Sequence, residues 1–495
     1  MERLVDDKAF LFIALWKGFA FRTFCTENRK NEMIGHLGDT IAAIATPMGE
    51  GAISVIRVSG ESALKNVANR FKGKQNLANA KSHTAHFGRI VDTKGNIIDD
   101  VVCTVFLAPT SFTGEETVEV SCHGGIHVTR QVLECLLETG TRPAQPGEFT
   151  QRAFLNGKLD LSQAEAVADL IQAQTDKAYK TSLNQLEGTL SKEIRLIRDQ
   201  LVKSVGLLEL ELDFVEENIE LIDKKKFEES IESGISAIEK LLCTYKYGKV
   251  WREGVRVALV GVPNAGKSSL LNALLHEDRA IVTDIPGTTR DFIEEKITIS
   301  GVLFRIIDTA GLRQTEDSIE QEGVKRTWKV TQTSDIIVLV HDSTKLITND
   351  ELEFLDYVRQ NHPQSGLIIA NNKIDLQAKK VIINIEIKRG LIVETSAISH
   401  EGIKLLISEF EKHVFDKSQA ESRESVTITN ERHYSALLRA KEGLSSSLES
   451  SRLRESEEFI ALDLRRAIDA IGEIIGFVTT EDIINNIFSK FCIGK

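Results

Sequence analysis

The stretch GVPNAGKSS, residues 261–269, lies between an apolar run, VRVALV at 255–260, and a helix-prone run, SSLLNALL at 268–275. It matches the pattern G-x-x-x-x-G-K-[ST], in which a glycine-rich turn joins a strand to a helix. Gly261 and Gly266 permit the tight turns that let backbone N–H groups surround phosphates. The unpaired N–H groups and dipole at the helix start also favour anions. The stretch therefore predicts a phosphate-binding loop.

Three further motifs follow in the order expected of a GTP-binding domain. DTAG at 308–311 follows the run LFRII, NKID at 372–375 follows LIIAN, and TSA at 395–397 follows LIVE. Asp375 can accept hydrogen bonds from two guanine donors that adenine lacks. A solvated turn could explain any one of these motifs alone, whereas the ordered set after apolar strands indicates a GTPase.

Each motif has its own expected chemistry. Lys267 would reach the β- and γ-phosphates, and Ser268 would bind Mg²⁺. Asp308 would hold the same Mg²⁺ through a water molecule, and Gly311 would sense the γ-phosphate. Backbone N–H groups of the TSA motif would support the base. We therefore expect GTP and Mg²⁺ as ligands.

The residue after DTAG is Leu312, where a Ras-like GTPase has a glutamine that orients water. Leucine cannot orient water, so catalysis needs another group. Asn264 in the phosphate loop is suited to ligate a monovalent cation, and the loop TDIPGTTRD at 283–291 offers further hydroxyl and carbonyl oxygens. Glu320 is our candidate for positioning the water.

The pattern around these motifs predicts a multidomain α/β protein. From about residue 255 to 414, strands and helices alternate, which implies a mostly parallel sheet covered by helices. Helical periodicity flanks this segment on both sides. Either helical segment alone would expose its apolar stripe, so we expect one discontinuous helical domain with a Ras-like P-loop G domain inserted into it. The expected parts are an N-terminal extension at 1–32, an α+β domain at 33–156, a first helical part at 157–253, the G domain at 254–416 and a second helical part at 417–495.

Composition limits the partners. The formal net charge of the 495 residues is -12, whereas proteins that coat nucleic acid are usually basic. Any RNA binding must use a local basic patch, or a basic partner must supply the attraction. None of the six cysteines forms a CxxC pair, which disfavours a zinc site or redox dithiol and fits a reducing compartment.

The N-terminus holds one apolar run, AFLFIALWKGFAF at 9–21. It is shorter than the roughly 20 residues that span a bilayer. The acids Glu2, Asp6 and Asp7 disfavour a signal or transit peptide. We interpret the segment before Met33 as an upstream extension, with a peripheral membrane helix as the weaker alternative. We therefore expect no stable membrane insertion and a cytoplasmic protein.

From about residue 40 to 495 the sequence resembles the tRNA-modification GTPase family MnmE (TrmE). The most specific stretches are SFTGEETVEVSCHGG, QPGEFTQRAFLNGKLDLSQAEAVADLI, GVPNAGKSSLLNAL, IVTDIPGTTRD, DTAGLR and the terminal FCIGK. The resemblance implies a homodimer that works with an MnmG-type protein, carrying FAD and NADH chemistry, in a heterotetramer. It also implies tRNA as substrate, with an aminomethyl or carboxymethylaminomethyl group added at the 5-position of the wobble uridine. A tetrahydrofolate derivative would be the one-carbon donor.

The resemblance also assigns residues. The contacts to GTP are expected from Asn264, Ala265, Gly266, Lys267, Ser268, Ser269, Thr283, Thr288, Thr289, Asp308, Thr309, Ala310, Gly311, Asn372, Lys373, Asp375, Ser396 and Ala397. Thr289 would join Ser268 on Mg²⁺, and K⁺ would be held by Asn264, Thr283, Ile285, Gly287 and Thr288. Glu320 aligns with the catalytic glutamate and Cys492 with the essential cysteine. The folate would contact Arg57, Glu119, Lys158 and Lys495.

The second candidate function is a regulatory or ribosome-assembly GTPase switch, but such relatives usually carry an RNA-binding domain such as KH, and no such segment follows residue 414. Without the family, Arg57 and Lys158 fit ordinary surface charges, and Cys492 fits a small buried apolar residue. The resemblance instead favours folate contacts for Arg57 and Lys158 and a catalytic role for Cys492.

Overall fold

The computed structural model describes residues 38–213, 223–277, 294–308, 328, 330–376, 391–414 and 426–495. Within them the chain divides into two compact units. The first holds residues up to Ala168, Gln185–Ile238 and Ala436–Lys495, and the second holds Asp169–Asn184 and Glu239–Ser435. No helix in these described ranges has the length and apolar character needed to cross a membrane.

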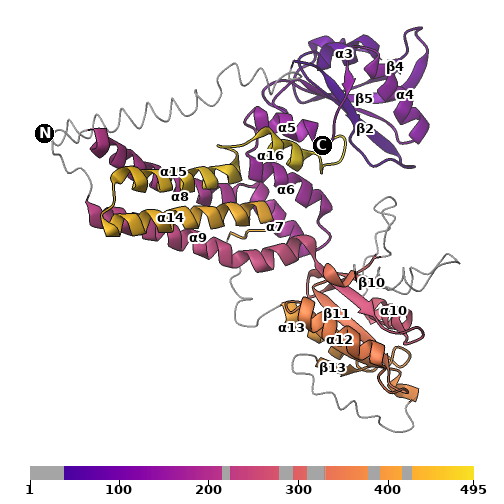
Figure 1. Cartoon of the computed structure of the whole chain (residues 1–495). Helices are drawn as coiled ribbons and strands as arrows, with labels where there is room; N and C mark the ends of the chain where they lie inside the picture. Colours follow the sequence, from indigo (N-terminus) through magenta and orange to yellow (C-terminus); the bar gives the residue numbers. More distant parts are fainter. Residues whose placement is uncertain are drawn as a thin grey trace. The chain divides into compact units, whose positions relative to one another are not determined.

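The first unit begins with a seven-stranded sheet in the order β3-β4-β5-β6-β2-β1-β7 (Figure 1). Its strands are β1 (Ile41–Ile44), β2 (Ile53–Ser59), β3 (Phe71–Gly73), β4 (Thr84–Val91), β5 (Ile97–Phe106), β6 (Thr117–His123) and β7 (Arg142–Pro143), with a 3₁₀ turn at Leu77–Asn79. Neighbouring strands are antiparallel except for β1 and β7, which are parallel.

Alternation along β2 and β6 sorts their side chains onto opposite faces of the sheet. One face, with Ile56 and Val120 fully buried, packs against α3 (Ala63–Arg70) and α4 (Ile126–Leu137). Arg57 directly follows Ile56 on β2, and Glu119 directly precedes Val120 on β6. Arg57 and Glu119 are also cross-strand partners. They therefore share the opposite face of the sheet.

Helices make up the rest of the first unit and continue into the second. They are α5 (Glu148–Leu155), α6 (Leu161–Gln172), α7 (Asp176–Leu186), α8 (Thr189–Asp213), α9 (Lys224–Glu253), α14 (Glu431–Leu453), α15 (Glu457–Ile475) and α16 (Glu481–Phe488). In the first unit α8 packs along α15, and Arg465 pairs with Glu209 at 2.5 Å. Segments from both sides of the α/β domain thus share one helical assembly, which confirms the discontinuous helical domain.

The second unit contains a six-stranded sheet in the order β13-β12-β11-β8-β10-β9, in which only β9 is antiparallel to its neighbour (Figure 1). The strands are β8 (Val255–Val260), β9 (Glu294–Ile299), β10 (Val302–Asp308), β11 (Ile336–Asp342), β12 (Gly366–Asn372) and β13 (Leu391–Glu394). The helices that cover it are α10 (Lys267–Glu277), α12 (Asn349–Asn361) and α13 (Ile403–Val414).

Helices cover both faces of this sheet, which is why its strands read as continuous apolar runs. On one face α10 and α13 pack on β8, β10 and β11, with the rings of Phe304 and Phe410 stacked at 5.9 Å. On the other face α12 packs on the alternate residues of the same strands. The carboxyl ends of the parallel strands meet at one edge, where α/β folds bind ligands. The multidomain α/β fold class is therefore confirmed.

Two neighbouring leucines test the packing of α13. Leu406 is 0% exposed and Leu405 is 52% exposed. We predict that Leu406→Ala lowers the free energy of unfolding of the second unit by about 2–5 kcal/mol, because it leaves a cavity. Leu405→Ala, the matched control, should change it by less than about 0.5 kcal/mol. Calorimetric melting of the full chain measures both, and equal melting of the two variants would contradict this packing.

Candidate functional site

The phosphate loop lies directly against the NKID motif. Gly266 has a φ of 98°, and a Cβ atom at this position would lie 2.3 Å from Nδ2 of Asn372. Glycine is therefore required for the two segments to approach. Asn372 Nδ2 donates to the carbonyl of Ala265 at 3.1 Å. Lys267 lies inside the loop, where its Nζ donates to the carbonyl oxygens of Gly261 at 2.7 Å and Val262 at 2.9 Å.

One pair of residues is suited to bind a metal ion: Ser268 at the start of α10 and Asp308 at the end of β10. Ser268 Oγ donates to Asp308 Oδ2 at 2.7 Å, which joins the phosphate loop to the end of β10. Asp308 is 6% exposed. A hydroxyl and a carboxylate are the hard oxygen ligands that Mg²⁺ prefers, so the donor set fits this ion.

The motifs expected to recognise the base are joined to each other. Asn372 Oδ1 accepts from the backbone N–H of Ala397 at 3.2 Å, and Ser396 Oγ donates to Asp375 Oδ1 at 2.6 Å. The backbone N–H of Thr395 donates to Asn371 at 2.9 Å. The NKID motif after β12 and the TSA motif after β13 therefore form one polar surface beside the phosphate loop.

Lys373 has a second partner that the sequence analysis missed. Its Nζ donates to the carbonyl of Asn264 at 2.7 Å and to Oδ2 of Asp342 at 2.7 Å. Burial alone would raise the pKa of Asp342, but hydrogen bonds from Lys373 and Thr344 outweigh it and lower the pKa to about 2. The available signal was that Asp342 follows the apolar run IIVLV, at the carboxyl end of a parallel strand.

A second cluster lies in the first unit, on the face of the sheet away from α3 and α4. Arg57 donates to Glu119 Oε1 from Nε at 3.0 Å and from Nη2 at 2.8 Å. The guanidinium carbon of Arg57 lies 5.4 Å from the ring centroid of Phe112 and 5.7 Å from that of Phe149. Arg57 is thus a partly buried charge between a carboxylate and aromatic rings, and not an ordinary surface charge.

The C-terminal residues reach the same cluster. Burial lowers the pKa of Lys495 and the positive charge of Arg57 lowers it further, while Glu119 and Cys492 act in the opposite direction. A Cβ atom on Gly494 would lie 2.3 Å from the carbonyl oxygen of Ile44, so the chain end lies tightly against β1. The structure therefore brings Arg57, Glu119 and Lys495 together, and we call these three residues the Arg57 cluster.

Two phenylalanines anchor this chain end. Phe488 and Phe491 contact each other, with ring centroids 5.4 Å apart, and join a buried cluster with Leu161 of α6. Cys492, the next residue, is exposed. This exposure is opposite to the buried apolar role that the residue type alone suggested.

Lys158 contacts the loop between β5 and β6. Its Nζ donates to the carbonyl of Pro109 at 3.1 Å, and its side-chain carbons lie beside Gly114. This loop also carries Phe112, which lies against Arg57. Lys158 itself is exposed, and the loop connects it to the Arg57 cluster.

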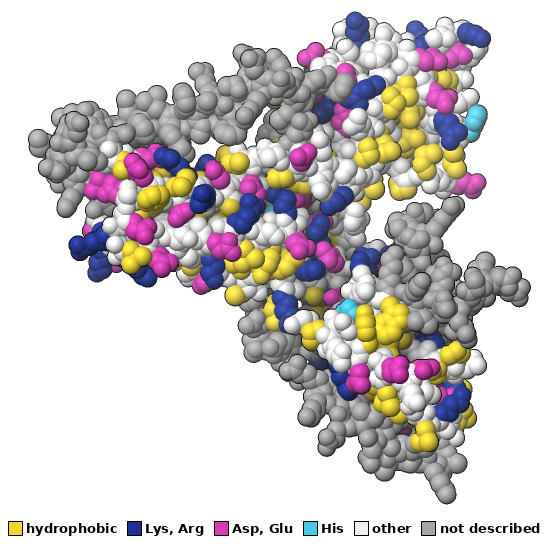
Figure 2. Space-filling model, viewed as in Figure 1, with side chains coloured by type: hydrophobic (Ala, Val, Ile, Leu, Met, Phe, Trp, Pro, Cys, Tyr) yellow, Lys and Arg dark blue, Asp and Glu magenta, His cyan; other side chains and the backbone are white. Residues whose placement is uncertain are grey.

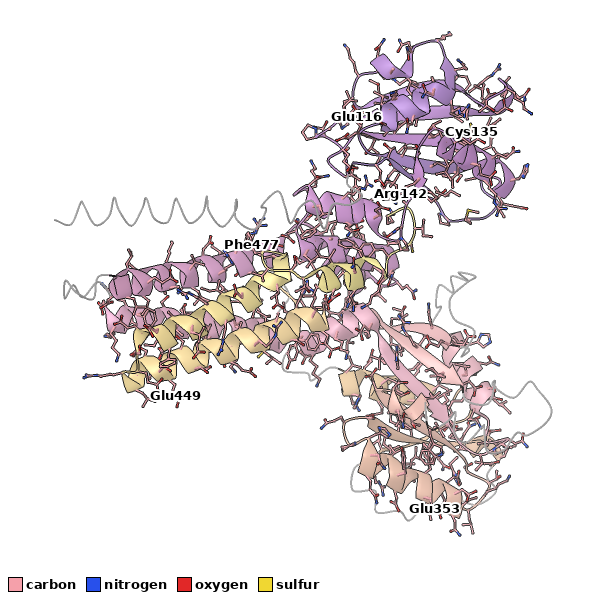
Figure 3. All side chains as sticks on the ribbon, turned by 45° about the horizontal axis from the view of Figure 1, so that its top comes forward. Glu116, Cys135, Arg142, Glu353, Glu449 and Phe477 are labelled. Carbon is pink, nitrogen blue, oxygen red and sulfur yellow. The ribbon has the colours of Figure 1, made fainter. Side chains whose placement is uncertain are left out.

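A buried ion network supports this cluster and was also missed. Arg152, with 3% of its side chain exposed, donates to Asp39 at 2.6 Å, to Glu148 at 3.0 Å and to Glu115 at 3.2 Å. Arg142, labelled in Figure 3, pairs with Asp39 and Glu148 as well. Burial alone would raise the pKa of Asp39 and Glu148, but hydrogen bonds from the arginines lower both.

Several residues singled out from the sequence lie outside the described ranges. They are Thr283, Ile285, Gly287, Thr288, Thr289, Thr309, Ala310, Gly311, Leu312 and Glu320, together with the extension at 1–32. Their expected roles stay predictions.

A mostly parallel sheet with a phosphate loop after β8 and a guanine-type motif after β12 defines a P-loop protein of the GTP-binding class. A family model described as the MnmE helical domain matches residues 161–492, and one described as the GTP-binding protein TrmE N-terminus matches residues 40–158.

Full-length relatives agree with these matches. The tRNA modification GTPase MnmE of Christiangramia forsetii is 41% identical over 476 residues, which cover 93% of this chain and 100% of that protein. The proteins of the same name from Bacillus velezensis and Aquifex aeolicus are 43% and 45% identical, and each alignment covers 92% of this chain and 100% of the relative. The chain belongs to the MnmE family of tRNA modification GTPases.

The Asp375 carboxylate offers a direct test of guanine recognition. We predict that Asp375→Asn weakens GTP binding and favours xanthosine triphosphate, because asparagine cannot accept both guanine donors whereas xanthine has an oxygen in place of the exocyclic amine. A competition titration with the two nucleotides measures this. Asp350→Asn, on the exposed first turn of α12, is the matched control and should keep the wild-type preference. Unchanged GTP affinity in the Asp375 variant would contradict the assignment.

Proposed function

We propose that this chain hydrolyses GTP and uses the reaction in the modification of tRNA. The observation that carries the proposal is the junction of phosphate loop and base-recognition motif, in which Asn372 binds Ala265 and Lys373 binds Asn264. The junction would hold both ends of a guanine nucleotide on one rigid sheet edge. Family membership supplies the link to tRNA.

The nucleotide would be held by the residues already described. Lys267 would leave its carbonyl partners in the loop and contact the β- and γ-phosphates, and Asp375 would accept from the base. Ser268 and Thr289 would hold Mg²⁺ directly and Asp308 would hold it through a water molecule; when bound, the ion neutralises charge on the phosphate oxygens. Ala397 and Ser396 would orient the base from the other side.

Hydrolysis would depend on K⁺ and on the carboxylate of Glu320. Leu312 stands where a water-orienting glutamine is usual, so another group must act. We assign K⁺ to Asn264 with the oxygens of Thr283, Ile285, Gly287 and Thr288. Glu320 would orient the attacking water. If Glu320→Ala kept the wild-type turnover, this assignment would be wrong.

The Arg57 cluster is suited to a tetrahydrofolate derivative. A pterin is flat and carries adjacent donors, while the folate tail carries carboxylates. Glu119 can accept from pterin donors, the exposed ring of Phe112 borders the site, and Lys158 and Lys495 can pair with carboxylates. The residues present therefore fit the ligand. Cys492, beside Lys495, would act on the one-carbon adduct or the pyrimidine.

Partners follow from the same reasoning. We infer a cytoplasmic homodimer that combines with an MnmG-type protein carrying FAD and NADH chemistry, and that acts at the 5-position of the wobble uridine. Figure 2 shows lysine and arginine side chains interspersed with acidic ones over the described helices in this view. With a net charge of -12, the attraction to tRNA would come partly from the partner protein.

The cation requirement gives a simple measurement. We predict faster GTP hydrolysis in K⁺ than in Na⁺ at equal ionic strength, because a monovalent cation near the bridging oxygen would stabilise charge as an arginine finger does. Asn264→Ala should lower the rate in K⁺ towards the rate in Na⁺. Equal wild-type rates in the two salts would contradict the assignment.

A substitution at Cys492 should separate GTP hydrolysis from wobble-uridine modification. A thiolate can add to an activated pyrimidine or an electrophilic one-carbon adduct, so we predict that Cys492→Ser abolishes wobble-uridine modification and leaves GTP hydrolysis unchanged. Cys243→Ser, at another exposed cysteine, is the control and should keep both activities. Normal modification by the Cys492 variant, or joint loss of both activities, would remove Cys492 from the catalytic assignment.

A further inference from the structure

A buried histidine lies behind the nucleotide-binding edge. His341, 2% exposed on β11, contacts Oε1 of Glu351 through Nδ1 at 2.9 Å and the carbonyl oxygen of Lys345 through Nε2 at 3.2 Å. None of these three residues belongs to the sequence motifs of the nucleotide site. We call residues 341–351 the His341 strap, because this histidine ties the two ends of the segment together.

The two partners of His341 favour its protonated form. A carboxylate and a carbonyl oxygen are both acceptors, and only the imidazolium has two N–H groups with which to satisfy both of them. Glu351 also accepts from the backbone N–H and hydroxyl of Thr348, in the capping box of α12. The Glu351 carboxylate is therefore held in place at the start of the helix, beside the buried ring of His341.

Hydrogen bonds connect the His341 strap to Lys373. Asp342, the next residue after His341, accepts from the backbone N–H of Lys345 through its carbonyl and from Thr344 through its carboxylate. The backbone N–H of Ser343 donates to the carbonyl of Asn372 at 2.8 Å. The other carboxylate oxygen of Asp342 binds Lys373, whose ammonium group also holds the carbonyl of Asn264.

We propose that Asp342 and His341 are positioning residues for the nucleotide: charged His341 fixes the strap, so that Asp342 holds Lys373 between the phosphate loop and the base. This inference rests on the proposed GTP site and adds two residues to it. Neither residue touches the nucleotide in this account. Both act through Lys373, which gives guanine-nucleotide affinity a dependence on pH.

The charged groups around His341 give the sign of that dependence. The hydrogen bond to Glu351 raises the pKa of His341 above its usual value, burial opposes the shift, and Asp342 and the Lys345 carbonyl add to it. On the neighbouring strand β12, the facing residue is the neutral Asn371. The imidazolium contacts are complete below the usual imidazole pKa of about 6.5 and are lost as pH rises through the raised value. Nucleotide binding should therefore weaken as pH rises.

The test is binding of mant-GDP, a fluorescent GDP analogue, to the full chain between pH 6 and 9 at constant ionic strength. For wild type we expect the dissociation rate to rise through one titration step. His341→Asn keeps a donor towards Glu351 but carries no charge, so the step should disappear. Glu351→Gln keeps an acceptor and should move the step to lower pH. Asp342→Asn should weaken mant-GDP about tenfold at every pH, the scale of a lost charge-assisted hydrogen bond.

The exposed His127 of α4 provides a matched control, and His127→Asn should keep the wild-type profile. The inference is overturned if His341→Asn retains the wild-type titration step, or if Asp342→Asn binds mant-GDP as wild type does. Should His341→Asn not fold, the shift with Glu351→Gln and the affinity of Asp342→Asn decide the question. Failure of wild type to bind mant-GDP would overturn the proposed GTP site as well, which distinguishes that result from loss of the pH step alone.

Discussion

The hydrogen bond from Asn372 to the carbonyl of Ala265 is the contact on which the nucleotide site depends. It joins the loop after β8 to the loop after β12, two segments 107 residues apart in sequence. The contact requires a glycine at position 266, since a Cβ atom there would lie 2.3 Å from the donor nitrogen. Parallel strand order makes it possible, because β8 and β12 both flank β11 and end at the same edge. The regions expected to bind the phosphates and the base are therefore joined into one site.

The Arg57 cluster depends on a different constraint, the burial of Arg152. An arginine with 3% of its side chain exposed needs partners of opposite charge. Three carboxylates from separate segments form salt bridges with Arg152. These carboxylates belong to the segment before β1, the β5–β6 loop and α5, which border the Arg57 cluster. Removing one partner would leave an unpaired buried charge, which is strongly destabilising. The network therefore fixes the segments around Arg57 and the chain end.

Sequence reasoning predicted the fold class, which the structure confirms, and it singled out the motif residues because phosphate binding demands particular residues at particular spacing after a strand. It could place Lys267 and Ser268 at the start of a helix and Asn372 at the end of a strand without knowing the packing. It could not find Arg152 or Asp342, because their partners are set by tertiary structure: Arg152 binds Asp39 across 113 positions and Lys373 binds Asp342 across 31. A buried charge and a solvated one look identical in sequence. Cys492 shows the same limit, since residue type favoured burial and the structure exposes it.

The central claim is that one chain joins a guanine-nucleotide site to tRNA modification. Mass analysis of tRNA nucleosides from cells lacking this protein tests it most directly. The account predicts that wobble uridines lose their 5-position aminomethyl-type substituent in these cells and regain it when the full chain is restored. An unchanged nucleoside profile in the deletion cells would contradict the claim and favour a regulatory or ribosome-assembly GTPase switch.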